Sequence, residues 1–317
     1  MSYVLLLIGF ALLIKGADYF VQGASNVATN LRVSPLLIGL TIVAFGTSAP
    51  EATVSIVAAF QGNAGVAIGN VIGSNIFNIT LVVGLTAFIF PLLVESETVR
   101  KEIPFALLGS IVLLVVIADS TLQGVNASLI TRGDGLILLL FFVVFLYYIF
   151  EVARKNRAAI PALDASHNPA WTKNTLLTVG GLVGIILGGE FVVRGATSIA
   201  LSLGMSETLV GLTIVAIGTS LPELITSVTA ALKKKAEIAL GNIVGSNIFN
   251  IFFVLGAAAT VAPLPVDPRI YIDAILTIGL TVLLFIFSRT NYRIGKREGV
   301  TLAVAYVIYM IYILLRN

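Results

Sequence analysis

Stretches of about twenty apolar residues recur along the whole chain, and this is the length that one membrane-crossing helix requires. Hydrophobic residues make up 58% of the sequence and charged residues only 11%, whereas soluble domains carry about 25% charged residues. Because a soluble core cannot absorb so much apolar surface, we predict an integral membrane protein. Cysteine is absent and the single histidine, His167, lies in a polar connector, which excludes disulfides and thiolate metal sites.

Ten of the apolar segments are predicted to be membrane helices. They span residues 3–24, 35–60, 65–90, 103–119, 133–153, 174–201, 208–232, 237–261, 270–288 and 298–315. A polar segment divides them five and five and is too short to form a domain. The predicted fold is therefore all-α, with a first five-helix membrane unit at residues 1–153, a short linker at 154–173 and a second five-helix unit at 174–317.

The two units repeat one another in sequence. GLTIVAFGTSAPEATVS, from Gly39, and GLTIVAIGTSLPELITS, from Gly211, are identical at most of their positions. GNVIGSNIFN, from Gly69, and GNIVGSNIFN, from Gly241, differ only at two positions and stand at the same offset in numbering (211 minus 39 equals 241 minus 69). Because five is odd, the second unit must cross the membrane in the opposite sense. Inverted repeats of this kind indicate a transporter, with its site near the midplane between the halves.

Basic residues gather in alternate connectors. If the N-terminus is outside, the inside connectors hold 14 lysines and arginines and the outside segments hold 3. The positive-inside rule therefore predicts both termini outside and the linker at 154–173 in the cytoplasm. Two further pairs, Lys15–Asp18 and Glu190–Arg194, are spaced for ion pairing within the first helix of each unit, and we expect them to pair internally.

A proline interrupts the longer repeated motif in each unit. Pro50 lacks an N–H and its ring clashes with the carbonyl four residues earlier, so the helix breaks there, and Pro222 does the same in the second unit. Such a break persists in a membrane only where it faces protein or a water-filled cavity. Carbonyl oxygens near Ala44–Thr47 and Ala216–Thr219 are therefore predicted to become available as ligands.

Glu51 and Glu223 follow the prolines directly, in the first turn of each resumed helix, where the helix dipole favours an ionised carboxylate. An acidic residue within a membrane costs about 2.5–3.5 kcal/mol, and two facing carboxylates repel unless a cation lies between them. Four hydroxyls stand beside them, those of Thr47, Ser48, Thr219 and Ser220. These hard oxygen donors suit Ca²⁺ or Na⁺ and not a transition metal. One Ca²⁺ or two Na⁺ would neutralise the two carboxylates.

A polar stripe follows each break, because three side chains spaced four residues apart share one helix face. The stripes consist of Asn70, Ser74 and Asn78, and of Asn242, Ser246 and Asn250. They could complete a cation shell, although helix packing is the favoured interpretation for Asn70 and Asn242. A purely structural interpretation of kinks and interhelical hydrogen bonds is open for any single copy. It weakens because every feature recurs at one offset and no basic residue lies near either glutamate.

Paired at one offset, "GTSAPE…GNVIGSNIFN" and "GTSLPE…GNIVGSNIFN" resemble the two alpha-repeats of the sodium/calcium exchanger family, within the Ca²⁺/cation antiporter superfamily. The resemblance covers the whole ten-helix layout and includes the short central linker typical of prokaryotic members. It implies inverted five-helix repeats packed around a central cluster of cation sites. It also implies that the first and sixth helices slide past this core and expose the sites to each side in turn.

The resemblance further implies a ligand set that is the same in both halves. In the first half the residues are Glu51, Thr47, Ala44, Ser48, Ser74 and Asn78. In the second half they are Glu223, Thr219, Ala216, Ser220, Ser246 and Asn250. Ca²⁺ would be held by the glutamates and the threonine carbonyls. Na⁺ would share the glutamates and use the serines and the alanine carbonyls, with the two asparagines at the middle.

Two positions bear on the counter-ion. Some relatives, including the potassium-dependent branch, carry an acid where Asn250 stands, so Asn250 weighs against a K⁺ requirement. It also removes a negative charge, so three Na⁺ would leave the site net positive if both glutamates are ionised. The proton-coupled branch usually lacks the Thr-Ser-x-Pro run before its glutamate, and its presence at residues 47–50 favours Na⁺ over H⁺.

Together these expectations describe a secondary active antiporter, not an enzyme, that exchanges Ca²⁺ for Na⁺ across the cell membrane by alternating access. Two alternatives stay open: an exchanger of the same superfamily that couples Ca²⁺ to H⁺ or another cation, and, less favoured, a cation channel. An intramembrane aspartyl-type hydrolase also uses two acids, but it leaves the duplicated breaks and stripes without a role. The expected partners are Ca²⁺, Na⁺ and the lipid bilayer, with no cofactor or nucleic acid and a functional monomer.

Overall fold

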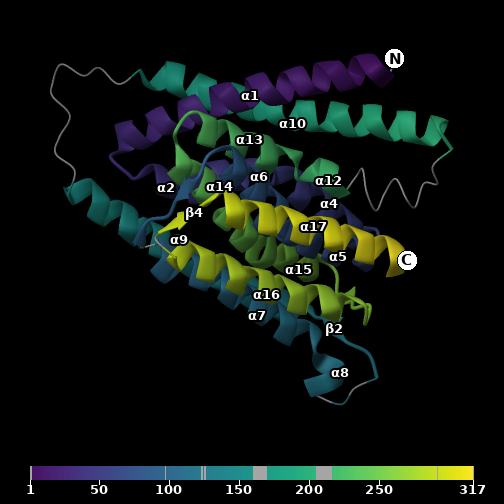
Figure 1. The fold of residues 1–317 in the computed structure, drawn as a ribbon. Coiled ribbons are helices and arrows are strands. Elements are labelled where there is room, and N and C mark those ends of the chain that lie inside the picture. The colour runs from purple at the N-terminus through teal and green to yellow at the C-terminus, as the bar shows by residue number, and fades with distance from the viewer. Residues whose placement is uncertain are drawn as a thin grey trace.

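The computed structural model describes residues 2–96, 98–122, 124, 126–159, 170–204, 216–290 and 292–316, and nearly all of them are helical (Figure 1). The α-helices are α1 (Ser2–Leu31), α2 (Pro35–Ile38), α3 (Ala44–Thr47), α4 (Ala49–Phe60), α5 (Ala64–Phe77), α6 (Val83–Ile89), α7 (Ile103–Ile117), α8 (Asp119–Leu122), α9 (Arg132–Ala159), α10 (Trp171–Ser202), α12 (Ala216–Thr219), α13 (Leu221–Leu232), α14 (Ala236–Phe249), α15 (Gly256–Val261), α16 (Ile270–Arg289) and α17 (Lys296–Arg316). The π-helical turns are η1 (Gly39–Val43), η2 (Asn78–Val82), η3 (Thr98–Glu102) and η5 (Asn250–Leu255). The short strands are β1 (Leu92–Leu93), β2 (Leu129–Ile130), β3 (Leu264–Pro265) and β4 (Arg293–Ile294).

Seven helical segments of the described chain are long and apolar enough to cross a membrane, or eight if the bent pair made by residues 35–47 and 49–60 counts as one span. This confirms an all-helical, multi-pass membrane protein. It is fewer than the ten predicted spans, for two local reasons. The apolar helix α7 has only 15 residues. The predicted span at 208–232 lies partly outside the described residues, which resume at Ala216.

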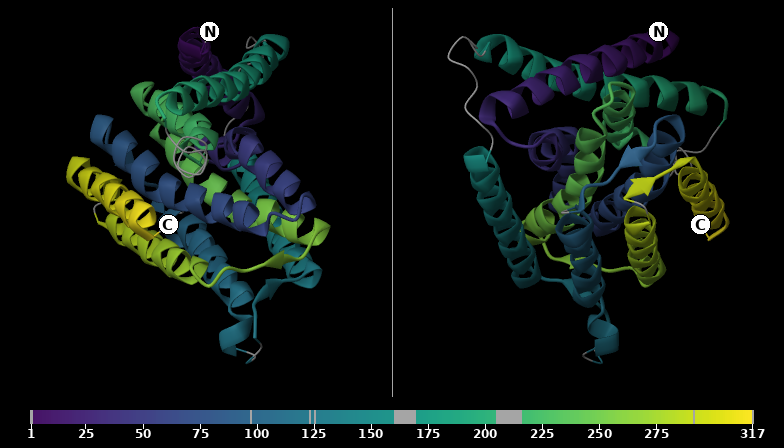
Figure 2. Two further views of the ribbon diagram at one scale, coloured as in Figure 1. Left: turned by 90° about the vertical axis from the view of Figure 1, so that its right-hand side faces the viewer. Right: turned by 60° about the vertical axis from the view of Figure 1, so that its left-hand side comes forward.

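Helices α1 and α10 run side by side in opposite directions and form a layer across one side of the molecule (Figures 1 and 2). Their contact is unusually close because glycines recur every seventh residue on both facing surfaces. In α1 these are Gly9, Gly16 and Gly23, and in α10 they are Gly181, Gly188 and Gly195. A Cβ atom at Gly16 would lie 2.8 Å from the carbonyl oxygen of Gly181. The backbones therefore touch, and no larger side chain fits between them.

Contacts between the two halves occur in related pairs. At one end of the α1–α10 pair the hydroxyls of Ser2 and Ser198 are 2.7 Å apart, and at the other end Asn26 donates to Asn174 over 3.0 Å. The repeat offset relates Ser2 to Asn174 and Asn26 to Ser198. The antiparallel pairs β1–β4 and β2–β3 likewise each join one half to the other. Such paired contacts are what two halves related by an approximate two-fold axis would make.

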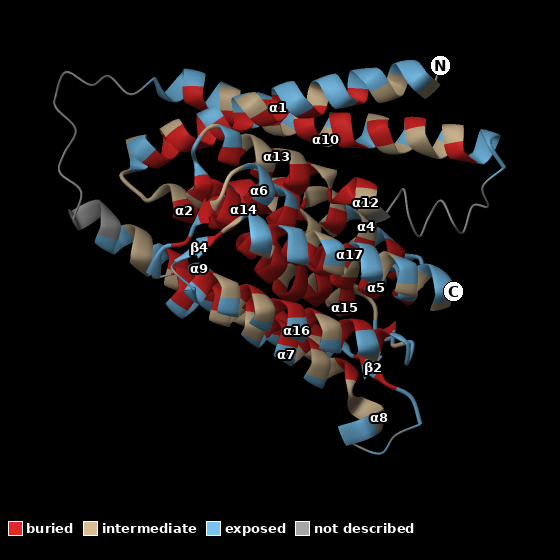
Figure 3. Cartoon of the chain, in the orientation of Figure 1, coloured by how far each residue is buried: buried red, intermediate tan, exposed pale blue. Residues whose placement is uncertain are grey.

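The core lies beneath this layer, along two helical rods that contain the GSNIFN motifs. One rod runs through α5, η2 and α6, and the other through α14, η5 and α15. Figure 3 shows buried residues concentrated there, whereas α1, α9 and α17 expose their outer faces. The exposed face of α9 carries large apolar side chains, among them Leu140, Val144 and Tyr147. An exposed apolar belt is expected where lipid, and not water, surrounds a helix.

Candidate cation site

The structure contains both predicted helix breaks. Ser48 separates α3 from α4 with a ψ of 9°, and Ser220 separates α12 from α13 with a ψ of 6°, whereas α-helical residues have a ψ near about −42°. The first break turns the chain by 47°. In each case the proline stands at the start of the resumed helix, where its missing N–H breaks no bond of that helix.

The carbonyl of Ala44, predicted to be available as a ligand, is engaged within the protein. It accepts hydrogen bonds from the Ser48 N–H at 3.0 Å, the Thr47 hydroxyl at 3.3 Å and the Ser246 hydroxyl at 3.5 Å. In the second half, the Ser220 N–H donates a hydrogen bond to the carbonyl of Ile217.

Glu51 and Glu223 lie at the centre of the molecule, and both side chains are fully buried. Each carboxylate is held by the serine at the break of the other half. Ser220 donates to Glu51 Oε1 over 2.9 Å, and Ser48 donates to Glu223 Oε1 over 2.8 Å. The hydroxyl of Ser220 also lies 3.0 Å from that of Ser74. The structure thus joins the predicted residues of the two halves crosswise.

Several oxygens at this centre have no hydrogen-bond donor among the described residues. They are Glu51 Oε2, Glu223 Oε2, Asn78 Oδ1 and Asn250 Oδ1, and all four are buried. The two asparagines also begin the π-helical turns η2 and η5, and such turns occur frequently at functional sites. Buried oxygens normally have a donor. A cation would satisfy several such acceptors at once.

The negative charge of this site comes from two carboxylates, those of Glu51 and Glu223. Within the described part of the chain, no group of three or more acidic, histidine or cysteine side chains is placed to hold a metal ion. Any further ligands must therefore be neutral oxygens. Hydroxyl, amide and carbonyl groups of this kind surround the glutamates, and they suit a hard cation such as Na⁺ or Ca²⁺.

Sequence reasoning missed Asn75 and Asn247, which connect the two rods. Asn75 donates to the carbonyl of Asn247 over 3.4 Å and accepts from Asn250 Nδ2 over 3.3 Å. Both residues belong to the repeated GSNIFN motif, so recurrence at the repeat offset was the available signal. Their spacing from the predicted stripe did not place them on its face.

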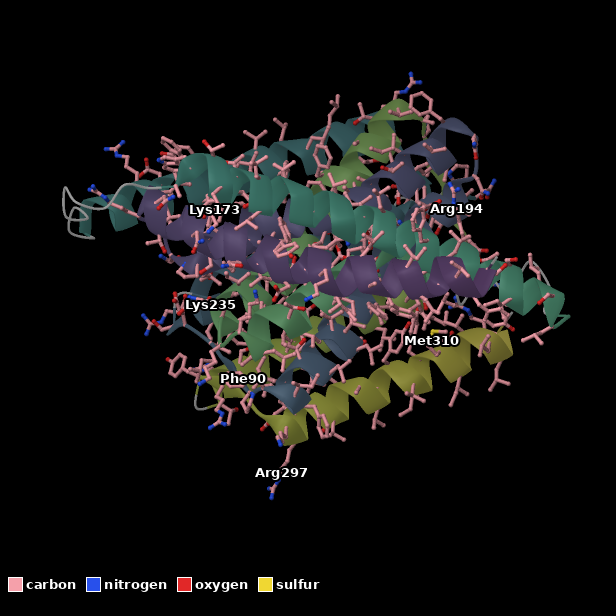
Figure 4. The ribbon with its side chains drawn as sticks, turned by 90° about the horizontal axis from the view of Figure 1, so that it is seen from above. Phe90, Lys173, Arg194, Lys235, Arg297 and Met310 are labelled. Atoms are coloured by element: carbon pink, nitrogen blue, oxygen red, sulfur yellow. The ribbon has the colours of Figure 1, made fainter. Side chains whose placement is uncertain are left out.

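A pocket of about 620 Å³ borders the centre in the described part of the structure. Its wall includes Gly69, Gly73 and Ser74 of α5 together with Thr219, and it extends to Met310 and its neighbours on α17. A Cβ at Gly69 or Gly73 would meet no atom of the described chain within 4 Å. Figure 4 shows Met310 towards one end of the helices and Lys173 and Lys235 towards the other. The open pocket therefore lies at the end away from these lysines.

The related face of the second half packs against residues of the first half. The glycines of α14 that correspond to Gly69 and Gly73 pack against the backbone of residues 36–40. A Cβ at Gly241 would lie 2.6 Å from the carbonyl of Leu36, and one at Gly245 would lie 2.7 Å from that of Leu40. The positions that the repeat offset relates to residues 36–40 are 208–212, which lie outside the described residues.

The charged residues of α1 and α10 differ in where their ion-pair partners lie. Glu190 and Arg194 form the predicted internal ion pair of α10. The prediction for α1 was wrong, because Asp18 pairs with Lys233 at the end of α13, 2.8 Å away, and not with Lys15. The same lysine also donates to the backbone carbonyl of Asp18 over 2.7 Å. A neighbouring helix brought the lysine within reach, which residue spacing within α1 could not reveal.

Comparisons with known proteins identify the family of this chain. The family described as sodium/calcium exchanger protein matches residues 1–151 and 173–315. The sodium/calcium exchanger MaX1 of Methanosarcina acetivorans is 34% identical, over 98% of this chain and 97% of that protein. A putative antiporter, CaxA of Alkalimonas amylolytica, is 40% identical over 96% of each chain. The inner membrane protein YrbG of Escherichia coli is 35% identical over 98% of this chain and 96% of its own.

Solved structures of the sodium-calcium exchanger NCX_Mj are similar over the whole chain. One, soaked with 10 mM Na⁺ and no Ca²⁺, superposes with a TM-score of 0.85 at 34% identity and covers 98% of both chains. Another, soaked with Na⁺ and Sr²⁺, superposes with a TM-score of 0.84. The relatives named for an activity are exchangers and antiporters, so this chain is a cation transporter and not an enzyme. With its matched family, its central glutamates and its fold in agreement, the chain belongs to the sodium/calcium exchanger family.

Proposed function

We propose that this chain is a secondary active antiporter that exchanges Ca²⁺ for Na⁺ across the membrane. The observation that carries the proposal is the pair of fully buried carboxylates, each with one oxygen that lacks a hydrogen-bond donor among the described residues. Two such carboxylates without compensation would be strongly destabilising inside a membrane protein. A bound Ca²⁺, or Na⁺ ions in its place, would supply the missing positive charge.

The proposed ligands are the twelve residues expected from the resemblance. Ca²⁺ would take Glu51 and Glu223 with the carbonyls of Thr47 and Thr219. Na⁺ would share the glutamates and use the serines and alanine carbonyls, with Asn78 and Asn250 between them. The serine set is Ser48, Ser74, Ser220 and Ser246, and the alanines are Ala44 and Ala216. The crosswise bonds from Ser48 and Ser220 support this set, because each serine already contacts a glutamate.

The proposed architecture is ten spans in two inverted units, residues 1–153 and 174–317, joined by the linker at 154–173. The paired contacts between the halves support it, as does the antiparallel packing of α1 on α10. The spans beyond the eight identified by length would be α7 and the segment ending in α13. By the distribution of basic residues, both termini would lie outside and the linker in the cytoplasm. A single chain would form the complete transport unit.

Exchange would follow from the electrostatics of the site. A site occupied by Ca²⁺ or by Na⁺ can be closed and carried to the other side, because the ions offset the carboxylates. An unoccupied site with two ionised glutamates cannot be closed at low free-energy cost. Ion occupancy would therefore be required for each change of access, and this requirement would couple the two fluxes.

The test is Ca²⁺ uptake by the purified chain in proteoliposomes under separate Na⁺, K⁺ and H⁺ gradients. We expect uptake that follows an outward Na⁺ gradient and does not depend on K⁺. Uptake driven by a pH gradient without Na⁺ would instead identify a Ca²⁺/H⁺ exchanger. Ca²⁺ conductance that needs no counter-ion would identify a channel, and either result would overturn the proposed coupling.

A further inference from the structure

We propose that Asn70 and Asn242 are positioning residues of the cation site. Each asparagine connects the helix break of one half to the glutamate-bearing helix of the other half through hydrogen bonds. This inference rests on the proposed function and adds to it a pair of residues outside the ligand set. Neither asparagine contacts a glutamate carboxylate in the structure, so any effect on ions must pass through the groups that it holds.

Asn242, on α14, makes three hydrogen bonds and is fully buried. Its Oδ1 accepts from the hydroxyl of Thr47, at the end of α3, over 3.0 Å. Its Nδ2 donates to the backbone carbonyl of Glu223 over 3.3 Å and to the hydroxyl of Ser227 over 2.9 Å. Thr47 belongs to the first half, whereas the other partners belong to the second. One side chain therefore joins the first break to the helix that carries the second glutamate.

Asn70, on α5, makes the same three bonds with the halves exchanged. Its Oδ1 accepts from Thr219 over 3.4 Å. Its Nδ2 donates to the carbonyl of Glu51 over 3.2 Å and to the hydroxyl of Ser55 over 2.9 Å. The same set of bonds at two repeat-related positions is not expected from unspecific helix packing. The repeated set indicates a structural role that both halves of the site require.

The chemistry of the amide determines how each asparagine must be oriented. A backbone carbonyl only accepts hydrogen bonds, so the group facing Glu51 or Glu223 must be the donating Nδ2. The Oδ1 must then face the threonine. Exchanging the amide oxygen and nitrogen would place two acceptors against each other at the glutamate. Because both polar groups of the side chain are engaged, each asparagine holds its three partners in one arrangement.

This arrangement holds each glutamate at two points. Thr47 reaches the backbone of Glu223 through Asn242, and its neighbour Ser48 bonds directly to the Glu223 carboxylate. Two adjacent residues of one half thus hold both ends of a glutamate in the other half. The threonine hydroxyl is also engaged by this network, which leaves the threonine carbonyl as the group for an ion.

The test is a double-mutant cycle on the complete chain, with Ca²⁺ affinity measured by calorimetry and Ca²⁺ uptake measured in proteoliposomes. The variants are Thr47→Val, Asn242→Ala and the double variant. Thr41→Val is the matched control, because the Thr41 hydroxyl bonds only to the Leu37 carbonyl of its own segment among the described residues. Each single variant is expected to weaken Ca²⁺ binding about 10- to 100-fold, as loss of a group that orients metal ligands does. The control should bind normally.

The double variant should lose less affinity than the two single losses combined, because both changes break the bond between Thr47 and Asn242. Thr219→Val with Asn70→Ala should repeat this pattern in the other half. Additive losses would overturn the inference, because the threonine hydroxyl would then act on the ion independently. A lowered melting temperature with unchanged Ca²⁺ affinity would also overturn it and leave a packing role only.

Two further results keep the test decisive. If Asn242→Ala does not fold, Ser227→Ala replaces it, because this change removes one bond of the same network and leaves the asparagine in place. It too should raise the Ca²⁺ dissociation constant. If the unaltered chain shows neither Ca²⁺ binding nor Na⁺-driven uptake, the proposed function itself fails. If the unaltered chain exchanges normally and the cycle is additive, only the positioning role fails.

Discussion

Glu51 and Glu223 are the residues on which ion binding depends, because they are the charged side chains buried at the meeting point of the breaks. Each glutamate accepts a hydrogen bond from a serine hydroxyl of the opposite half. Its other carboxylate oxygen has no donor in the described chain. A glutamine has the same shape but no charge. Substitution therefore separates the electrostatic role of the carboxylate from its role in packing.

We expect Glu51→Gln and Glu223→Gln each to reduce Na⁺-driven Ca²⁺ uptake at least about 100-fold, because removing one member of a buried charged set costs about 3–5 kcal/mol. Glu190→Gln is the control, since that acid is half-exposed and pairs with Arg194 on α10. Its uptake should stay close to that of the unaltered chain. Normal exchange by both central variants would exclude the site.

At the scale of helices, the glycine seam between α1 and α10 makes these two helices a single packed pair. The repeated seven-residue spacing keeps glycines on the contact line along most of both helices. Small residues allow close backbone approach in membranes, where van der Waals packing and not a hydrophobic force joins helices. Side chains larger than hydrogen at these positions must push the pair apart.

The seam leads to a prediction with an adjacent control. A Cβ at Gly181 would lie 2.5 Å from the Phe20 nitrogen and 2.7 Å from the Gly16 carbonyl, whereas a Cβ at Gly180 would meet no atom of the described chain within 4 Å. Gly181→Ala should therefore destabilise the fold by about 1–3 kcal/mol, as overpacking does. Gly180→Ala should leave the melting temperature in detergent unchanged or slightly higher. Equal melting temperatures for the two variants would contradict the close contact.

At the scale of the whole molecule, the two halves share a sequence pattern, and each contributes one rod to the core. The α5 face lines the pocket and the α14 face is covered by residues 36–40, whereas the counterparts of that cover, residues 208–212, lie outside the described residues. Val66 lines the pocket and is 44% exposed, whereas Ile238, its counterpart in the second half, is fully buried. Under the proposed alternating access, the faces of α5 and α14 would be exposed in turn.

Because the chain contains no cysteine, the exposure of positions 66 and 238 can be measured by labelling single introduced cysteines. A single cysteine at Val66→Cys should react rapidly with a water-soluble maleimide, and one at Ile238→Cys should react slowly in the same buffer. Under alternating access, conditions that speed Ile238→Cys should slow Val66→Cys. Parallel changes in both rates would speak for general loosening of the structure and against alternating access.

The ion pair between Asp18 and Lys233 should favour the observed arrangement, because it ties α1 to the end of α13. The residues at the repeat-related positions are Glu190 and Gln61, so the second half lacks the lysine. Lys233→Gln should then raise the labelling rate of Ile238→Cys by up to about fivefold, since exposed ion pairs contribute about 0.2–1 kcal/mol.

The control for this effect is Lys234→Gln, which removes the same charge from the adjacent position without touching Asp18. Its labelling rate should match that of the unaltered lysine segment. A faster rate in both variants would assign the effect to the overall positive charge of residues 233–235 and not to the ion pair.

Much of the site was predictable because its signals are local. Pro50 acts on its own helix, Glu51 follows within one turn, and the stripe of Asn70, Ser74 and Asn78 follows from helical periodicity. Asn70 hydrogen-bonds to the backbone carbonyl of Glu51 and to Ser55 on α4, and this detail lay beyond helical periodicity. Local rules did not show that the carbonyl of Ala44 accepts a hydrogen bond from Ser246 of the other half.

The sequence alone determined the membrane class, the duplication, both helix breaks and the two central glutamates, because composition and residue spacing act within a few turns of one helix. Only the tertiary structure decided which hydroxyl meets which carboxylate, which helix supplies the partner of Asp18, and which residues cover the glycines of α14. The hydroxyl–carboxylate bonds and the Asp18 ion pair join residues from opposite halves of the sequence. They depend on how the two halves pack against each other, which spacing within either half does not determine.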